Sequence, residues 1–310
     1  MHFSAAFTAI IATWAATVAA APAKSSGSAT HSASSSGSSS APSGGSKASS
    51  WAYNNFNGEN DKSWKAQWNV NQWAYPQPGA KSDSNQNLNL VPNPTNSSEQ
   101  VMKIAYPAGS WNPADSNTIG GVGFYATPIE IPSSADQITF TYDAYFPKGF
   151  DFNKGGKLMG LYGGHSDCSG GNSAASCFST RFMWRSSGAG EVYAYLDKDK
   201  QVDNFCTESG VICNDDYGDS LGRGSFNWGT GQWNTVTQIV KLNTPGKQDG
   251  TLEVSHNGKD IISMKNLYYR DAKFATTGID FETFFGGSTS DWASPKDQYA
   301  YFKGFKLSWE

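Results

Sequence analysis

Residues 178–196, FSTRFMWRSSGAGEVYAYL, restrict the fold of this chain more than any other segment. Two runs of alternating side chains flank a short Ser/Gly turn, and this period of two is typical of paired β-strands. One face of the hairpin is apolar: Phe178, Phe182, Trp184, Val192, Ala194 and Leu196. The other face is largely polar: Ser179, Arg181, Met183, Arg185, Glu191, Tyr193 and Tyr195. The segment therefore predicts a sheet with one buried face and one face that is free to bind a ligand.

Strand periodicity recurs along the chain, whereas helical periodicity is nearly absent. Residues 138–146, 233–242 and 299–309 have strand-like patterns, and residues 252–264 are typical of a hairpin with an Asn-Gly turn. Strands at this spacing predict an all-β fold, an antiparallel β-jelly roll in which two sheets form a sandwich and one sheet forms a concave substrate groove. A barrel of another topology is the alternative.

The chain divides into three parts. Residues 1–21 have a short apolar core and an alanine-rich end, which indicates a secretory signal peptide rather than a membrane anchor. Residues 22–50 are a low-complexity Ser/Gly-rich tract with almost nothing to bury, so we expect a disordered linker. Residues 51–310 then form one large β-jelly-roll domain, which carries the function.

Four cysteines and one glycosylation sequon also favour a secreted, extracellular protein. The cysteines allow three disulfide connectivities, and we favour the local pairs because each closes a short polar loop: Cys168 with Cys177, and Cys206 with Cys213. A zinc site is the alternative, but the spacings do not match a C-x-x-C pattern. The sequon Asn96-Ser97-Ser98 makes Asn96 the expected glycosylation site.

The composition limits the partners of the chain. Aromatic residues make up 14% and charged residues 16%, and the formal net charge is −4. Such a chain has no general attraction for a polyanion, so binding to one needs a local basic site. No segment resembles a nucleic-acid-binding module, and no later segment could span a membrane. We expect a monomer.

Pairing the two strands of the hairpin brings its polar groups together. With Arg185 opposite Glu191, Arg181 falls opposite Tyr195 and Met183 opposite Tyr193. A register shift of two residues would change these partners but not the face. Just upstream, Lys154 and Lys157 lie on another candidate strand.

Lysine, arginine, serine and two tyrosines are the groups that a lyase for acidic sugars requires. Cleaving a 4-linked uronate by β-elimination removes the proton on C5, which is weakly acidic while the neighbouring carboxylate is ionised. A cation at the carboxylate stabilises the enolate-like transition state. A base takes the proton and an acid protonates the departing O4. Because Arg and Lys neutralise the charge, we expect no metal and no cofactor.

These segments resemble polysaccharide lyase family 14, whose members act on alginate and glucuronan. The resemblance covers roughly residues 150–310 and runs through GGKLMGLYGG, FSTRFMWR, GEVYAY, RGSFNWGTGQW, LNTPGKQDG, FFGG and QYAYFKGFKLSW. It implies a β-jelly roll and a functional set of a lysine, S-x-R and Y-x-Y. In this sequence these match Lys157, Ser179, Arg181, Tyr193 and Tyr195.

The hypothesis is thus a secreted polysaccharide lyase that acts on an acidic polysaccharide, a glucuronan- or alginate-type polyuronate. Arg181, with Ser179, would bind the carboxylate, and Tyr193 or Tyr195 would act as the acid, while the sequence leaves the base open between a tyrosine and Lys157. Lys157 would be the base or a charge stabiliser. Without the resemblance, Lys154 would be an equal candidate.

Other residues have two interpretations each. Arg185 could contact the substrate or form an ion pair with Glu191 at the end of the hairpin. His165 could contact the substrate or be a polar loop residue. Asp280 and Glu282 could form the carboxylate pair of a glycoside hydrolase, although positions i and i+2 of one strand are neighbours rather than groups across a sugar. A non-catalytic carbohydrate-binding module is the second alternative.

Overall fold

The computed structural model describes residues 49–74, 87–271 and 274–310. They belong to one compact unit, residues 46–310. The predicted signal peptide lies outside the described residues, as does the predicted linker up to residue 48. The first strand begins at Ser50, the last residue of the range predicted as linker, and pairs with the C-terminal strand.

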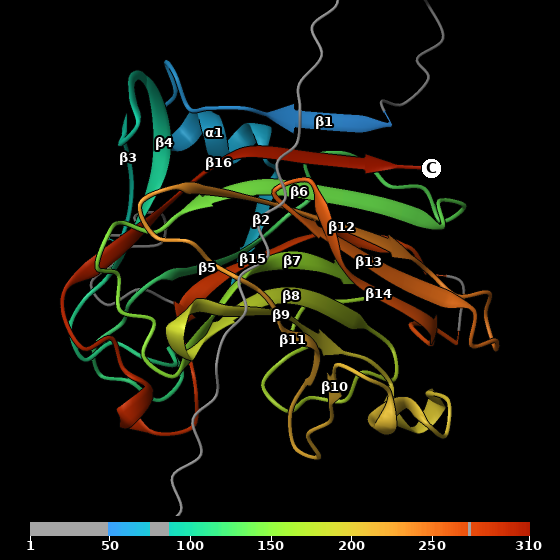
Figure 1. Cartoon of the computed structure of the whole chain (residues 1–310). Helices are drawn as coiled ribbons and strands as arrows, with labels where there is room; N and C mark the ends of the chain where they lie inside the picture. Colours follow the sequence, from blue (N-terminus) through green and yellow to red (C-terminus); the bar gives the residue numbers. More distant parts are fainter. Residues whose placement is uncertain (1–48, 75–86, 272–273) are drawn as a thin grey trace, which may run out of the picture. The chain divides into compact units, whose positions relative to one another are not determined.

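The described residues form strands joined by turns, with one short helix and a few 3₁₀ turns (Figure 1). The strands are β1 (Ser50–Tyr53), β2 (Val70–Trp73), β3 (Leu88–Asn93), β4 (Asn96–Tyr106), β5 (Val122–Ala126), β6 (Gln137–Tyr145), β7 (Gly155–Gly163), β8 (Phe178–Arg185), β9 (Ala189–Tyr195), β10 (Val211–Ile212), β11 (Asp219–Asn227), β12 (Trp233–Lys241), β13 (Gly250–His256), β14 (Lys259–Leu267), β15 (Thr276–Phe285) and β16 (Gln298–Trp309). The helix is α1 (Asp61–Gln67), and the 3₁₀ turns are Ser186–Gly188, Lys198–Lys200, Phe205–Thr207 and Ser290–Trp292.

Within the described residues the strands assemble into two antiparallel sheets of eight strands each. In sheet A the order is β14-β13-β12-β6-β16-β4-β3, and β1 also pairs with β16. In sheet B the order is β10-β11-β9-β8-β7-β15-β5-β2. The predicted strands at 138–146, 233–242 and 299–309 correspond to β6, β12 and β16, and the predicted hairpin to β13–β14. The all-β, antiparallel two-sheet sandwich is confirmed.

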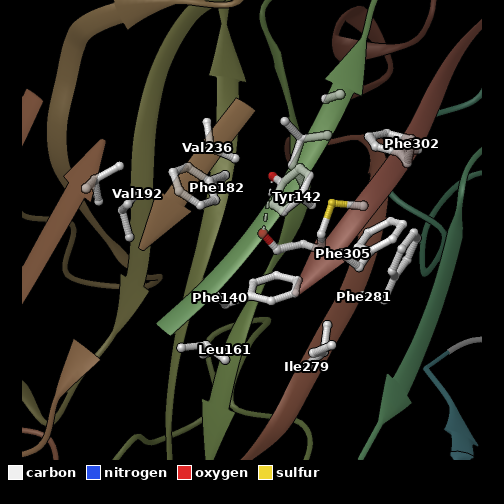
Figure 2. Close-up of a cluster of buried hydrophobic side chains, with 14 of the residues drawn as sticks. Phe140, Tyr142, Leu161, Phe182, Val192, Val236, Ile279, Phe281, Phe302 and Phe305 are labelled. Atoms are coloured by element: carbon white, nitrogen blue, oxygen red, sulfur yellow. Dashed lines mark hydrogen bonds between the residues drawn. The ribbon is translucent and has the colours of Figure 1, made fainter. Parts of the chain in front are cut away.

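The core lies between the two sheets. Figure 2 shows Phe140 and Tyr142 of β6 facing Phe182 of β8 and Leu161 of β7. All four side chains are buried, because alternate residues of each strand point to the same side. The predicted apolar face of the hairpin is confirmed as core: Phe178, Phe182, Trp184, Val192, Ala194 and Leu196 are all buried. The opposite face of sheet B consequently carries the polar set.

Both predicted disulfides are present, one between Cys168 and Cys177 and the other between Cys206 and Cys213. Asn96 is exposed at the start of β4, where its side-chain oxygen accepts hydrogen bonds from Ser98. Among the described residues, no helix has the length and apolar character that crossing a membrane requires.

Candidate active site

The β8–β9 hairpin has a register two residues away from the expected one. The observed pairs are Ser179 with Tyr195, Arg181 with Tyr193 and Met183 with Glu191. The expected pairs were wrong: Arg181 with Tyr195, Met183 with Tyr193 and Arg185 with Glu191. The turn is shorter than expected, since only Ser186–Gly188 connects the strands and Ser187 takes a positive φ of 60°. A shift of two residues keeps every side chain on its predicted face.

Lys157 lies on β7 directly opposite Met183 of β8, on this same face. Its Nζ is 4.6 Å from the centroid of the Tyr193 ring and 5.8 Å from that of Phe284. Burial, reinforced by the Arg181 cation, lowers the pKa of Lys157 to about 7, although Glu282 and Asp280 act in the opposite direction. A large fraction of Lys157 is therefore a free amine near neutral pH, as a general base must be.

The two tyrosines lie next to each other on β9. Their ring centroids are 5.8 Å apart and the rings are nearly perpendicular. Tyr193 is half-buried, whereas Tyr195 is only 4% exposed. Burial and then Tyr195 raise the pKa of Tyr193 above its ordinary value, against the effect of Arg185 and Arg181. Tyr193 therefore keeps its proton at neutral pH and can act as an acid.

Arg181 is fully buried and bound to two carboxylates of β15. Its Nη1 forms an ion pair with Glu282, and its Nε lies 3.4 Å from Asp280 Oδ2. Gly160 of β7 lies between Arg181 and Asp280 in the sheet, and a Cβ there would meet the Thr180 carbonyl oxygen at 2.0 Å. Without a side chain at this position, the arginine and the carboxylates can meet across β7.

The charges of this cluster influence one another. Burial and the neighbouring Glu282 raise the pKa of Asp280, while Arg181 and Lys157 oppose the rise. Burial alone would lower the pKa of Arg181, but Asp280 and Glu282 hold it above its ordinary value. Arg181 is thus a permanent cation beneath the face, and its Nη2 has no hydrogen-bond partner among the described residues.

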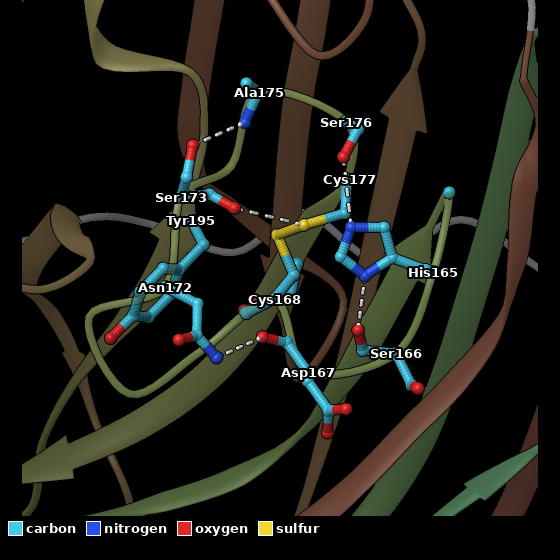
Figure 3. The surroundings of a disulfide bond; sticks show 12 residues. His165, Ser166, Asp167, Cys168, Asn172, Ser173, Ala175, Ser176, Cys177 and Tyr195 are labelled. Atoms are coloured by element: carbon cyan, nitrogen blue, oxygen red, sulfur yellow. Dashed lines mark hydrogen bonds between the residues drawn. A yellow bond between two sulfur atoms is a disulfide. The ribbon is translucent and has the colours of Figure 1, made fainter.

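Ser179 and Tyr195 both contact the loop that the Cys168–Cys177 disulfide closes, and Figure 3 shows Tyr195 beside this loop. The Ser179 hydroxyl donates to the Cys168 carbonyl oxygen at 2.8 Å, and the Gly171 N–H donates to Tyr195 Oη at 3.2 Å. Ser179 is fully buried. The hydrogen bond of Ser179 thus anchors the loop to the sheet, and the hydrogen bond from Gly171 positions the Tyr195 hydroxyl.

His165 begins the same loop and is exposed. Its Nδ1 lies 2.6 Å from the Ser166 carbonyl oxygen and its Nε2 lies 3.1 Å from Ser176 Oγ, as Figure 3 shows. Both ring nitrogens are thus engaged by residues of the loop itself.

Arg185 and Glu191 form the predicted ion pair, with Arg185 Nη2 2.6 Å from Glu191 Oε1. Glu191 is fully buried, and its other oxygen binds two residues of β11: Arg223 Nε at 2.6 Å and Ser220 Oγ at 2.5 Å. Arg185 Cζ is 5.7 Å from the centroid of the Tyr193 ring. This second cationic group therefore borders the Lys157–Tyr193 pair.

The candidate site lies on the outer face of sheet B, away from two cavities of the described structure. A cavity of about 710 Å³ in the described part of the chain is lined by residues 127–131 and 274–277, among others. Another of about 540 Å³ is lined by residues 149–153 together with Ser186, Ser187 and Lys296. Neither includes a predicted site residue.

Residues 94–305 match the family model described as Polysaccharide lyase 14. This match spans more than half of the chain. The chain belongs to polysaccharide lyase family 14. It is therefore a lyase, and its two-sheet sandwich is the jelly roll of that family.

Solved structures agree with the family 14 assignment. An alginate lyase of this family from Aplysia kurodai is 33% identical, with a TM-score of 0.73, covering 84% of this chain and 98% of that chain. An alginate lyase from Chlorella virus is 26% identical, with a TM-score of 0.62, covering 81% and 96%. An endo-β-1,4-glucuronan lyase from Trichoderma reesei shares the fold at 8% identity and a TM-score of 0.50, covering 83% and 94%. No curated protein sequence matches this chain.

Further residues of this family 14 lyase contact the predicted site residues, and the sequence pattern did not place them there. Asp280 and Glu282 were considered as a hydrolase pair, but the structure binds both to Arg181. Arg223 and Ser220 contact Glu191, and no local motif points to them. Only the pairing of β11 with β9 places Arg223 and Ser220 beside Glu191, and this pairing depends on contacts between residues far apart in the sequence.

Proposed function

We propose that this family 14 lyase cleaves 4-linked polyuronates, of the alginate or glucuronan type, by β-elimination and leaves a 4,5-unsaturated uronate end. One observation carries the proposal: an amine with its pKa lowered to about 7, Lys157, lies 4.6 Å from the ring of a tyrosine that keeps its proton, Tyr193. A base and an acid on one face are what the elimination needs.

In the proposed reaction Lys157 is the base. Its free amine takes the proton from C5, the electron pair of the C5–H bond forms the C4–C5 double bond, and the C4–O4 bond breaks. Tyr193 donates its proton to the departing O4. In gluco- and manno-configured uronates H5 and O4 lie on the same side of the ring, which suits an acid and a base placed side by side.

The cations stabilise the negative charge that develops on the substrate carboxylate. Arg181 lies beneath the face, where Asp280 and Glu282 offset its charge, and it lowers the pKa of Lys157. Arg185 has a side chain that is 17% exposed, and it can contact the carboxylate directly. Ser179 and Tyr195 maintain the structure of the face through their hydrogen bonds to the disulfide loop. His165 contacts the substrate at the edge of the face.

The choice of substrate rests on relatives. The Aplysia kurodai and Chlorella virus structures, at 33% and 26% identity, are both described as alginate lyases. The Trichoderma reesei glucuronan lyase supports the fold alone. We therefore place alginate first among the polymers to be tested and glucuronan second.

We also propose that the protein is secreted as a monomer with a signal peptide at residues 1–21, a linker at 22–50 and a glycan on Asn96. Two disulfides favour an oxidising compartment.

The test is the ultraviolet absorbance of the unsaturated product during incubation with polymannuronate, polyguluronate and glucuronan. The wild type should produce it with at least one of these polymers. Lys157→Ala and Tyr193→Phe should each lower kcat by a factor of about 10² to 10⁴ while the polymer still binds.

Matched controls are available on the same molecule. Lys154 is exposed and pairs with Asp291, and Tyr299 lies on sheet A, so Lys154→Ala and Tyr299→Phe should keep wild-type rates. Polymer binding without product would support a binding module, and new reducing ends without the ultraviolet signal would support a hydrolase. Either result overturns the proposal.

A further inference from the structure

One buried carboxylate holds two arginines at the edge of the candidate active site. Glu191 Oε1 accepts from Arg185 Nε at 2.8 Å, and Glu191 Oε2 accepts from Arg223 Nε at 2.6 Å. Glu191 is fully buried, whereas the side chains of Arg185 and Arg223 are 17% and 37% exposed. The carboxylate thus fixes both guanidinium groups from below and leaves part of each accessible.

A β-bulge brings Arg223 to this position. The pairing of β11 with β9 shifts between Leu221 and Phe226, opposite Glu191. Gly222 and Gly224, on either side of Arg223, have φ of 66° and 78°, a conformation that favours glycine. Bulges often redirect a side chain next to an active site. Here the bulge turns Arg223 back over the sheet, where its Nε also donates to Ser220 Oγ at 3.1 Å.

The two arginine clusters on this face differ in charge. Around Arg181, one guanidinium meets two carboxylates and is fully buried. Around Glu191, one carboxylate meets two guanidiniums that reach solvent. An anionic group that approaches the face is therefore attracted to the Glu191 cluster. The Nη groups of Arg223 bind no side chain or carbonyl in the described part of the chain, so they can hydrogen-bond a carboxylate.

We propose that Arg223, next to Arg185, forms a subsite for a second carboxylate of the polyuronate chain, beside the sugar that reacts at Lys157 and Tyr193. The inference rests on the proposed function, because it assumes an acidic polymer on this face. Arg185 lies between the proposed subsite and the reacting sugar, since it contacts both Glu191 and the Tyr193 ring. Arg223 is a binding residue here and takes no part in the proton transfers.

The test is steady-state kinetics of Arg223→Gln on the polymer that the wild type cleaves best. Removing a charge-assisted contact made equally in the ground state and the transition state raises KM and leaves kcat almost unchanged. We expect KM to rise about tenfold and kcat to stay within about threefold. Added salt should raise KM of the wild type more steeply than that of the variant.

Arg223→Lys keeps the charge but loses the planar guanidinium group. Its KM should therefore lie between that of the wild type and that of Arg223→Gln. Lys241→Gln removes the same charge from an exposed site on β12 of sheet A and should keep the wild-type KM. If Arg223→Gln does not fold, as judged by its thermal unfolding, Arg223→Lys carries the test with a smaller rise in KM.

The outcomes separate the inference from the function on which it rests. If the wild type makes no unsaturated product with any polyuronate, the proposed function is wrong. If the wild type is active and KM of Arg223→Gln and Arg223→Lys equals the wild-type value, the subsite is wrong. A fall in kcat with unchanged KM also contradicts it, because Arg223 would then act in the transition state.

Discussion

Lys157 occupies a position where a charged amine is unfavourable. It lies on a half-buried strand face with Arg181 nearby, and both effects lower its pKa to about 7. Tyr193, whose ring Lys157 contacts, shows the opposite effect, because burial raises the pKa of its phenol. Neighbouring groups with pKa values moved in opposite directions fit the proposed roles of Lys157 as base and Tyr193 as acid.

The pH dependence of the reaction follows from these two shifts. Since Lys157 must be unprotonated, kcat/KM should rise about tenfold per pH unit below pH 7 and level off above it. Tyr193 keeps its proton throughout this range, so no fall is expected just above neutrality. Initial rates measured between pH 5 and about pH 9 check this. A profile that is flat across pH 7 would exclude Lys157 as the base.

Lys157 should also limit the stability of the fold. Its pKa is lower in the folded state than in the unfolded state, so the unfolded chain binds more protons between pH 7 and about 10.4. The resulting penalty is fully present below pH 7 and disappears as the pH rises through this range. Lys157→Met should therefore stabilise the protein by about 1 kcal/mol at pH 6.

Urea unfolding at pH 6 measures this difference. Lys154→Met, at the exposed lysine nearby, is the matched control and should change the free energy of unfolding by less than about 0.5 kcal/mol. A Lys157→Met variant less stable than the wild type would show that Lys157 is not under electrostatic strain.

At the residue scale, the sequence predicted which side chains share the face but not what each of them touches. Alternation alone put Arg181, Tyr193 and Tyr195 on one side, because the period of a strand is two. Arg181 is nevertheless buried, since Asp280 and Glu282 reach it from β15, about 100 residues away in the sequence. Such a partner depends on which strands become neighbours, which a local pattern does not contain.

At the scale of elements, the hairpin and the disulfide loop together set the position of Tyr195. The expected face was correct, whereas the register was wrong by two residues because Ser187 accepts a positive φ and shortens the turn. A serine in this conformation is uncommon, so a turn this tight could not be predicted from the local residues. The loop closed by Cys168–Cys177 then covers Tyr195 from the other side.

The two disulfides should differ in their effect on activity. Replacing Cys168 and Cys177 by serine frees the loop whose Gly171 N–H binds Tyr195, so kcat/KM should fall about tenfold. The same change at Cys206 and Cys213, which enclose the edge strand β10, should alter it by less than about twofold. Kinetics at a temperature where both variants are folded makes the comparison. Equal losses would mean that the first loop does not position the site.

At the scale of the whole molecule, the residues that stabilise the fold and the residues of the candidate site lie on different faces of the sandwich. The inner faces of the two sheets supply a continuous aromatic core, and the outer face of sheet B carries the polar set. The sequence predicted this division well, because apolar alternation along each strand determines which face is buried. The order of strands within each sheet could not be predicted, since it is set by pairing between distant segments.

Because the site and the core both lie within residues 46–310, a chain shortened to these residues should keep the activity of the full chain. We expect kcat/KM within about twofold of the full chain and an unfolding temperature within a few degrees. Parallel kinetics and calorimetry of the two proteins test this. A loss of activity in the shortened chain would assign a catalytic or binding role to residues 1–45.

The mass of the products tests the central claim most directly. Elimination adds no water, so the two fragments of a defined uronate oligosaccharide should together have the mass of the substrate. No oxygen from labelled water should enter them, and Lys157→Ala and Tyr193→Phe should form the same fragments about 10² to 10⁴ times more slowly. Fragments that together exceed the substrate by the mass of one water, with labelled oxygen incorporated, would contradict β-elimination by Lys157 and Tyr193.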